Sequence, residues 1–89
     1  MRTFSRSSQF KKDIKRQARR GKDMARLKVV MDALIDEQPL PLQLQDHPLR
    51  GEWSGSRDCP VESDWVLIYA LEASHVRFER TGTHSDLFE

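Results

Sequence analysis

The feature that most constrains the fold is the apolar run WVLIYAL at residues 65–71, in a chain of only 89 residues. Its β-branched and aromatic side chains fit the surface of a pleated strand, so it predicts the principal strand of a sheet. The run is far shorter than the roughly 20 residues that a membrane-spanning helix needs, and no membrane association is expected. A chain of this size buries only about 60% of its unfolded surface, which predicts one small domain over residues 1–89.

A strand over residues 76–83 is expected to pair with this run. Its residues alternate in polarity, and residues 72–75 are enough to join the two strands as a hairpin. Strict alternation places Arg80 on the strand face of Val76 and Phe78, where its guanidinium must either reach the sheet edge or meet an anion. A short strand or turn around Trp53 and an opening strand at residues 1–4 complete the expected β-structure.

Two helices are predicted between the opening strand and these later strands. Serines at positions 5, 7 and 8 are candidate N-caps for a helix that begins near Gln9. The helix is expected to stop at Gly21, because glycine adopts a left-handed backbone conformation at little energetic cost. Its apolar residues Phe10, Ile14 and Ala18 form one narrow stripe.

The second helix should begin after Asp23, which is a good N-cap, and end before the prolines at positions 39 and 41. Its apolar residues recur every three or four positions from Met24 to Ile35, so one face packs on the rest of the protein. The expected order is βααβββ with a C-terminal tail. Two N-terminal helices on a small antiparallel sheet make an α+β fold.

The net charge of +1 conceals a strong asymmetry along the chain. Residues 1–30 hold eleven Lys and Arg against two Asp, a net charge of +9, whereas residues 31–89 carry −8. Charged helices are often simply solvated, but this excess is more than solubility requires and predicts a polyanionic partner. The residues expected to contact RNA are Lys11, Lys12, Lys15, Arg16, Arg19, Arg20 and Lys22.

Candidate catalytic groups lie in the later half of the chain. His47 and His84 flank the predicted strands, and convergence of these two with Asp64 and Arg80 would suit acid/base catalysis with anion stabilisation. Two other interpretations stay open, since loop histidines are often surface residues and Asp64 could simply cap a turn. Cys59, the single cysteine, cannot form an internal disulfide and is expected as a small buried thiol in a cytoplasmic protein.

Other site classes are disfavoured or left open by the sequence. The histidines and the cysteine lack the paired spacing of metal ligands, and glycine-rich phosphate loops are absent, so no metal and no cofactor are expected. The tryptophans are expected as core or rim residues. Phe88 is different, because an aromatic in a polar tail suits either a partner cleft or stacking on a nucleobase.

Three segments carry a family resemblance: DHPLRGEWSGSRD, then VESDWVLIY, then VRFERTGTHSDLF. With the helix pair and PLPLQLQDHPL before them, they resemble the YafQ branch of the RelE/ParE toxin superfamily across essentially the whole chain. The resemblance implies a RelE-like fold and a toxin of a bacterial type II toxin-antitoxin pair, which cuts messenger RNA in the ribosomal A site without a metal. Its implied partners are a cognate antitoxin, the ribosome and messenger RNA.

The resemblance also implies roles for individual residues. It assigns acid/base or charge-stabilising roles to four residues and substrate-positioning roles to two aromatic residues. The four are His47, Asp64, Arg80 and His84, and the aromatic residues are Trp65 and Phe88.

One position departs from the family pattern. Relatives commonly read DxHVEPDW where this chain reads DCPVESDW, so Pro60 replaces a histidine of the implied active site. Proline neither donates nor accepts a proton through its side chain. Two outcomes stay open: an attenuated endoribonuclease, or a catalytically silent homologue that binds antitoxin and ribosome and acts in operon autoregulation. A gyrase-inhibiting ParE-type toxin is a weaker alternative, because such toxins lack the histidine motifs.

Overall fold

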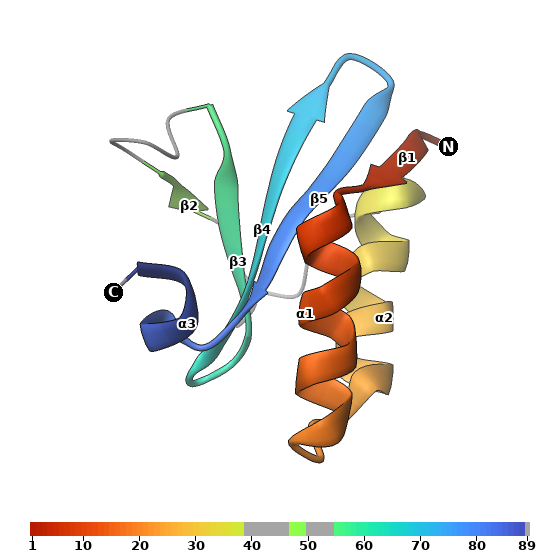
Figure 1. Cartoon of the computed structure of the whole chain (residues 1–89). Helices are drawn as coiled ribbons and strands as arrows, with labels where there is room; N and C mark the ends of the chain where they lie inside the picture. The colour runs from red at the N-terminus through yellow and green to blue at the C-terminus, as the bar shows by residue number, and fades with distance from the viewer. Residues whose placement is uncertain (39–46, 50–54, 89) are drawn as a thin grey trace.

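The computed structural model describes residues 1–38, 47–49 and 55–88 and confirms the α+β fold class (Figure 1). The opening strand, the two helices and the two hairpin strands are found in the predicted order, with two further strands between the helices and the hairpin and a helix at the C-terminal end. The expected strand or turn around Trp53 lies outside the described residues. The elements are β1 (Thr3–Arg6), α1 (Ser8–Arg19), α2 (Met24–Ile35), β2 (His47–Pro48), β3 (Arg57–Glu62), β4 (Trp65–Glu72), β5 (His75–Gly82) and α3 (His84–Phe88).

The strands form one sheet in the order β1-β5-β4-β3-β2. All neighbours are antiparallel except β1, which runs parallel to β5, so the sheet is mixed rather than wholly antiparallel as predicted. Helices α1 and α2 cover one face, and α3 lies on the other (Figure 1). Because the predicted principal strand β4 has neighbours on both sides and layers on both faces, its residues 65–70 are buried.

The helix boundaries follow from the capping residues. The Ser7 hydroxyl accepts a hydrogen bond from the Phe10 amide, and the Asp23 carboxylate accepts one from the Ala25 amide, as expected of N-caps. Gly21 has a φ of 81°, which confirms it as the point where the chain leaves α1. The opening strand begins two residues later than predicted, at Thr3.

The buried face of α1 differs from the predicted apolar stripe. Phe10 is buried and Ile14 is partly buried, but Ala18 is exposed. Asp13 and Gln17 are buried in its place, with relative exposures of 3% and 0%. The reason is that both side chains have polar partners there, since Asp13 accepts a hydrogen bond from the Thr81 amide at the edge of β5 and Gln17 Nε2 donates to Asp86 Oδ2.

A β-bulge in β5 corrects the predicted position of Arg80. Tyr69 pairs with Phe78 and Ile68 pairs with Arg80, so β5 has one extra residue between these two pairs. After the bulge the alternation is shifted, and Arg80 shares its face with Ile68 rather than with Phe78. The Arg80 side chain therefore leaves the strand on the face that carries α3.

Asp13 joins α1 to this bulge. Its Oδ2 accepts hydrogen bonds from Arg80 Nε at 2.7 Å and from the Thr81 amide at 3.2 Å, and its Oδ1 accepts one from Arg80 Nη2 at 3.2 Å. A buried carboxylate is tolerated only when it is paired and hydrogen-bonded in this way. Asp13 is thus an internal partner for Arg80 that the sequence pattern did not reveal.

Pro60 lies within β3. Its strand is paired with β4 on one side, but β2 pairs only with Arg57 and Asp58. In the part of the chain that the structure describes, β3 is therefore an edge strand at Pro60, which is where a sheet tolerates a residue without an amide donor.

No helix within residues 1–38, 47–49 and 55–88 combines the length and the hydropathy needed to cross a membrane.

Replacing Asp13 with alanine should lower the free energy of unfolding by about 2 to 3 kcal/mol, because Arg80 and the Thr81 amide lose a charged acceptor in a largely buried place. Urea unfolding followed by circular dichroism measures the change. Asp23→Ala is the matched control, since it removes a carboxylate from an exposed helix end and should cost about 1 kcal/mol. Equal losses in the two variants would contradict a special role for Asp13.

Candidate active site

Asp64 and His84 are the two predicted catalytic residues that the fold brings into direct contact. Asp64 lies in the turn between β3 and β4, and His84 is the first residue of α3. The Asp64 Oδ1 atom accepts a hydrogen bond from the His84 amide at 3.0 Å and lies 2.6 Å from His84 Nδ1. Both side chains are more than half exposed, so the pair is open to a substrate.

The electrostatics of this pair favour an ionised carboxylate. The hydrogen bond from the His84 amide, followed by the contact with its imidazole, lowers the pKa of Asp64, and the nearby Lys22 ammonium lowers this pKa further. Asp64 thus stays negative at neutral pH and can orient the imidazole through Nδ1. The other ring nitrogen, Nε2, then remains for proton exchange.

Phe88 lies one helical turn after His84 on α3. The two ring centroids are 6.0 Å apart, and Phe88 is 42% exposed. Leu87, between them in sequence, points the other way and packs on Val66 and Ile68 of β4. The helix thus presents an imidazole and an aromatic ring together, beside an apolar anchor.

His47 lies on β2, at the edge of the sheet opposite β1, and faces the same side of the sheet as α3. It pairs with Asp58 of β3, and the row continues through Ile68 to Arg80. Residues that are directly opposite in antiparallel strands share one face, so His47 and Arg80 lie at two ends of one row. His47 Nδ1 is 3.9 Å from Asp58 Oδ1, a buried carboxylate oxygen that has no hydrogen-bond partner among the described residues.

Arg80 is held rigidly at its end of this row. Its ion pair with Asp13 uses Nε and Nη2, which leaves Nη1 outside the pair. The side chain keeps 22% of its surface exposed. Arg80 can therefore offer a fixed positive charge to an anion over the sheet, and its pair with Asp13 agrees with the expectation that it reaches the sheet edge or meets an anion.

Trp65 lies in the core and not at the surface of the protein. Its side chain is fully buried in the core, and the indole Nε1 donates a hydrogen bond to the Thr81 hydroxyl at 2.8 Å. That hydroxyl donates in turn to the Val66 carbonyl at 2.9 Å. This position agrees with the expectation that the tryptophans are core or rim residues, and the substrate-positioning role that the family resemblance implies for Trp65 stays a prediction.

Pro60 lies on the same face of the sheet as Arg80, in the next row of paired residues across the strands. It pairs with Val66, which pairs with Gly82 two residues before His84. The position where the family pattern has histidine thus faces the α3 side of the sheet, and its side chain is partly exposed. A histidine there would point toward the same surface as His84.

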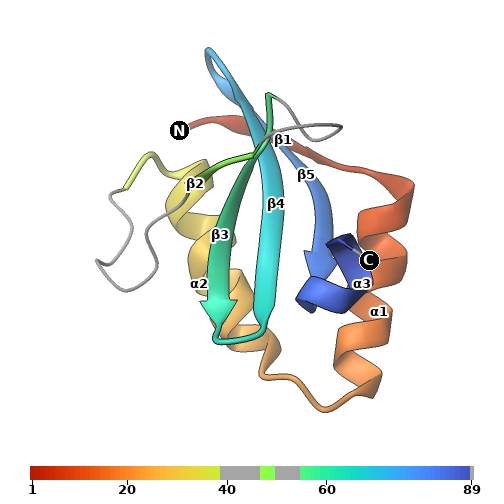
Figure 2. The ribbon, with the colours of Figure 1, turned by 90° about the vertical axis from the view of Figure 1, so that its left-hand side faces the viewer.

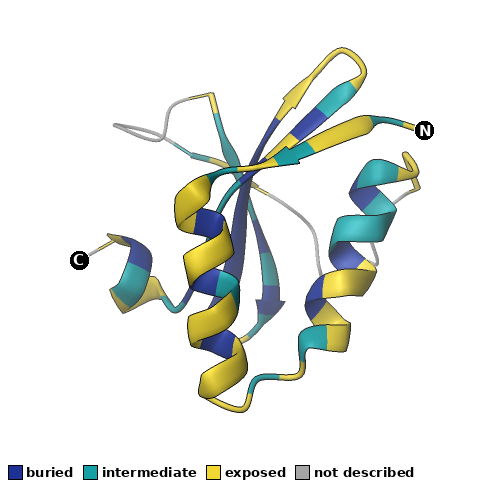
Figure 3. Cartoon of the chain, turned by 45° about the vertical axis from the view of Figure 1, so that its right-hand side comes forward, coloured by how far each residue is buried: buried dark blue, intermediate teal, exposed yellow. Residues whose placement is uncertain are grey.

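The predicted RNA-binding residues fall into two groups. The basic side chains along α1, which Figure 3 shows to be largely exposed, are all exposed to solvent, and four of them form no ion pair with the described residues. These four are Lys11, Lys12, Lys15 and Arg19. Arg16 and Arg20 instead form ion pairs with Asp86 of α3, at 3.4 and 2.6 Å. Lys22 is turned toward the site, with its ammonium 6.0 Å from the Trp65 ring.

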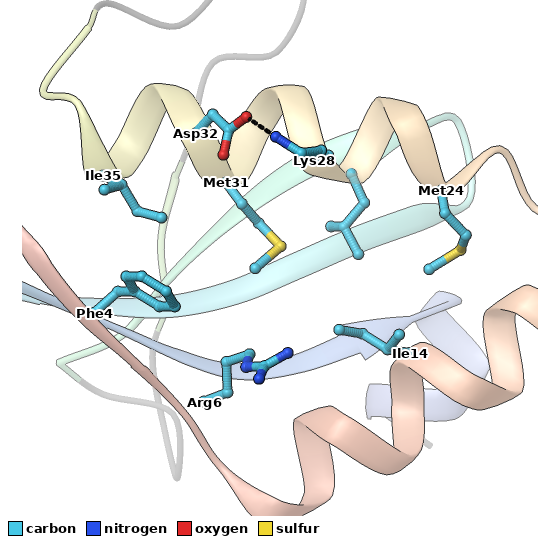
Figure 4. A pocket seen from close by; sticks show the side chains of 9 residues that line it. Phe4, Arg6, Ile14, Met24, Lys28, Met31, Asp32 and Ile35 are labelled. Carbon is cyan, nitrogen blue, oxygen red and sulfur yellow. Dashed lines mark hydrogen bonds and ion pairs between the residues drawn. The ribbon is translucent and has the colours of Figure 1, made fainter.

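A separate groove of about 400 Å³ opens between β1, α1 and α2 (Figure 4). Phe4, Ile14, Met31 and Ile35 line it with apolar side chains, and the Lys28–Asp32 ion pair lies at its rim. None of the predicted catalytic residues lines it. The groove therefore offers hydrophobic contact to a partner rather than proton transfer to a substrate.

Three acidic residues near the site were missed by the sequence analysis. Asp13 holds Arg80, Asp58 faces His47, and Asp86 holds the arginines of α1. Only Asp86 has a local signal, because Thr83 three residues earlier makes a capping pattern at the start of a helix. The other two depend on contacts between distant segments.

The chain and its fold match known proteins closely. A family model described as "Bacterial toxin of type II toxin-antitoxin system, YafQ" matches residues 2–89. The chain is 53% identical to the mRNA interferase toxin YafQ of Escherichia coli K12 over 83 residues, which are 92% of this chain and 90% of the relative. The crystal structure of YafQ from E. coli BL21(DE3) superposes with a TM-score of 0.95 at 49% identity, covering 100% of both chains. The E. coli DinJ-YafQ complex matches with a TM-score of 0.93 at 50% identity, again over 100% of both chains.

The Asp64–His84 contact should persist from neutral pH down to about pH 4 and weaken only below it. The reason is that a lowered folded-state pKa makes the contribution of Asp64 present above the ordinary aspartate value of about 3.9, and lost as the pH falls toward the folded value. NMR titration of the Asp64 carboxyl carbon measures the midpoint. His84→Ala keeps the backbone amide, so the midpoint should rise part of the way to 3.9, whereas His75→Ala should leave it unchanged. An unchanged midpoint in His84→Ala would show that the imidazole does not act on Asp64.

Proposed function

The chain belongs to the YafQ family of bacterial toxins of type II toxin-antitoxin systems, and on that premise we propose that it is an endoribonuclease that cuts messenger RNA on the ribosome. The observation that carries the proposal is the exposed Asp64–His84 pair with the Phe88 ring beside it. These three side chains supply proton exchange and a stacking surface at one point of the molecular surface.

The proposed chemistry is cleavage by the ribose itself. The 2′-hydroxyl loses a proton and attacks the adjacent phosphorus, and the bond to the 5′ oxygen breaks as that oxygen receives a proton. His84 and His47 would exchange these two protons, and Asp64 would orient the His84 ring. Arg80 would stabilise the charge that develops on the phosphate, and Phe88 would position a base.

Proton transfer and a fixed cation meet the needs of this reaction, so we propose that it runs without a metal. Arg80 suits the second need, since its pair with Asp13 fixes the direction of the guanidinium before a substrate arrives. A cation that is already oriented spends no reorganisation energy during the reaction.

The exposed basic side chains of α1 would bind ribosomal RNA. Lys11, Lys12, Lys15 and Arg19 share a helix whose outer side is open to solvent, and such charges bind phosphates without sequence preference. Arg16 and Arg20 contribute less to this surface, because their charge is compensated by Asp86.

We also propose a cognate antitoxin as a protein partner. In E. coli, YafQ crystallises in a complex with DinJ. Here the basic side of α1 and the apolar groove of Figure 4 offer charge and hydrophobic contact on adjoining surfaces. A small acidic antitoxin that folds on binding could use both.

The second candidate is a toxin homologue without catalysis, and Pro60 is the observation that favours it. A side chain that cannot exchange a proton faces the side of the sheet on which His84 lies. If a third acid/base group is indispensable there, the chain would bind its antitoxin and the ribosome and act in operon autoregulation.

Purified protein should cut a defined messenger RNA at A-site codons on programmed ribosomes and leave the same RNA intact without ribosomes. Loss of one acid/base group lowers a rate by about 10² to 10⁴, which is the effect expected of His84→Ala. His75→Ala is the matched control, because His75 bonds only to hydroxyls of β1 among the described residues. A transition-metal chelator that spares ribosomal magnesium should not change the rate. Strong cleavage of naked RNA, or full activity in His84→Ala, would count against the mechanism.

Pro60→His should raise the cleavage rate by about 10- to 10⁴-fold, since it restores an acid/base group on the α3 side of the sheet. Mapping of 5′ ends on programmed ribosomes compares it with the unchanged chain, and Pro60→Gln controls for loss of the ring without adding an imidazole. If the unchanged chain is inactive and leaves growth unaffected while it still binds antitoxin, the silent homologue is correct. If Pro60→His gives no increase, the position has no part in the chemistry.

A further inference from the structure

The short helix α3 carries His84 and Phe88 but cannot hold its own position. It has five residues, and isolated helices of that length are unstable in water. Leu87 anchors it by packing on Val66 and Ile68, with 7% of its surface exposed. Apolar packing is non-directional, so this contact does not fix the rotation of α3 about it. The direction of the His84 ring needs an additional, directional anchor.

Asp86 supplies directional bonds within the first turn of α3. Its amide donates to the Thr83 hydroxyl at 3.1 Å, and the Thr83 amide donates to Asp86 Oδ2 at 3.0 Å. These reciprocal bonds form a capping box with aspartate in place of glutamate. Since His84 lies between the two residues, the box fixes the amide that binds Asp64.

The same carboxylate also binds α1. Arg20 donates from Nη1 to Oδ2 at 2.6 Å and from Nη2 to Oδ1 at 3.1 Å, which is the strong bidentate geometry. Arg16 Nη2 lies 3.4 Å from Oδ1, and Gln17 Nε2 donates to Oδ2 at 3.4 Å. Only 9% of the Asp86 side chain is exposed. The Arg20 hydrogen bond holds the pKa of Asp86 far below its usual range, so the carboxylate stays ionised.

The end of β5 fits closely around this carboxylate. A Cβ atom on Gly82 would lie 2.8 Å from Asp86 Oδ2 and 3.0 Å from Asp86 Cβ. Asp86 therefore contacts α1 and the end of β5 in addition to its own helix. Figure 2 shows α3 at the end of β5 and in front of α1, and the ion pairs of Asp86 with Arg16 and Arg20 join the two helices.

We infer that Asp86 is a positioning residue for RNA cleavage, which locks α3 onto α1 and β5 so that His84 meets Asp64 and Phe88 stays beside His84. The catalytic part of this inference rests on the proposed function, whereas the positioning of the two rings can be measured in the free protein. Asp86 also compensates the charges of Arg16 and Arg20, whose side chains stay exposed on α1 and at its end.

NMR of the isotope-labelled free protein tests the positioning directly. In the unchanged chain, NOEs between the His84 and Phe88 rings and the ¹⁵N shift of His84 Nδ1 should report the ordered pair. Asp86→Ala should remove the NOEs and change the ¹⁵N shift, while the buried Trp65 indole signal stays. Ser85→Ala is the matched control on the same helix, at an exposed position. If Asp86→Ala keeps both signatures, the inference is wrong. Should that variant fail to fold, Arg20→Ala breaks the clamp from the other side, and unchanged signatures in it would likewise overturn the inference.

Cleavage kinetics on programmed ribosomes test the consequence. Asp86→Ala should lower kcat by about 10- to 100-fold and change KM much less, because a small misplacement of a reacting group has this effect. Ser85→Ala should cleave normally. If Asp86 acts through Arg20, Asp86→Ala/Arg20→Ala should lose no more activity than the worse single variant, and additive losses would overturn the clamp. An unchanged chain that cuts nothing would instead defeat the proposed function, and the NMR result would still decide the clamp.

Discussion

The arrangement of this protein depends on the buried carboxylate of Asp13. Strand β1 pairs with β5 only from His75 to Phe78, and beyond that point α1 lies along the strand edge. Ser7 begins the replacement, since its amide donates to the Phe78 carbonyl at 3.0 Å and its hydroxyl to the Glu79 carbonyl at 2.7 Å. Asp13 completes it by accepting the Thr81 amide and the Arg80 guanidinium. A helix thus satisfies backbone groups that a strand would otherwise bind, which stabilises the bulge.

The two faces of the sheet carry different kinds of side chains. On the side of α1 and α2, large side chains such as Trp65, Tyr69 and Phe78 form the core. On the side of α3, the core that the described residues form is small, with Val66, Ile68 and Leu87 and with Leu49 beside them, and it is bordered by titratable groups. The bulge transfers Arg80 from the first face to the second. The large core on the side of α1 and α2 thus leaves the side of α3 with a mostly polar surface.

Acidic residues decide how the basic half of the chain is used. Of the bases on and after α1, Arg16 and Arg20 are bound by Asp86, and Lys22 acts on Asp64. The lysines at positions 11, 12 and 15 remain on the outer side of α1. Part of the positive charge thus organises the site, and part is left for a polyanion. Charge counts along the sequence do not separate these two uses, because each pair joins segments more than 40 residues apart.

The sequence alone determined the helices, the order of the elements, the main strand and the α+β class, because periodicity, caps and apolar runs act over a few neighbouring residues. The family motifs also directed attention to Asp64 and His84, which the fold brings together. Only the tertiary structure decided the face of Arg80, the burial of Asp13 and Gln17, and the helical form of the tail. These features depend on a one-residue bulge and on ion pairs such as Arg20–Asp86, 66 positions apart. A local pattern cannot specify these features, because each one is stabilised by contacts that form only when distant segments of the chain pack together and shield them from water.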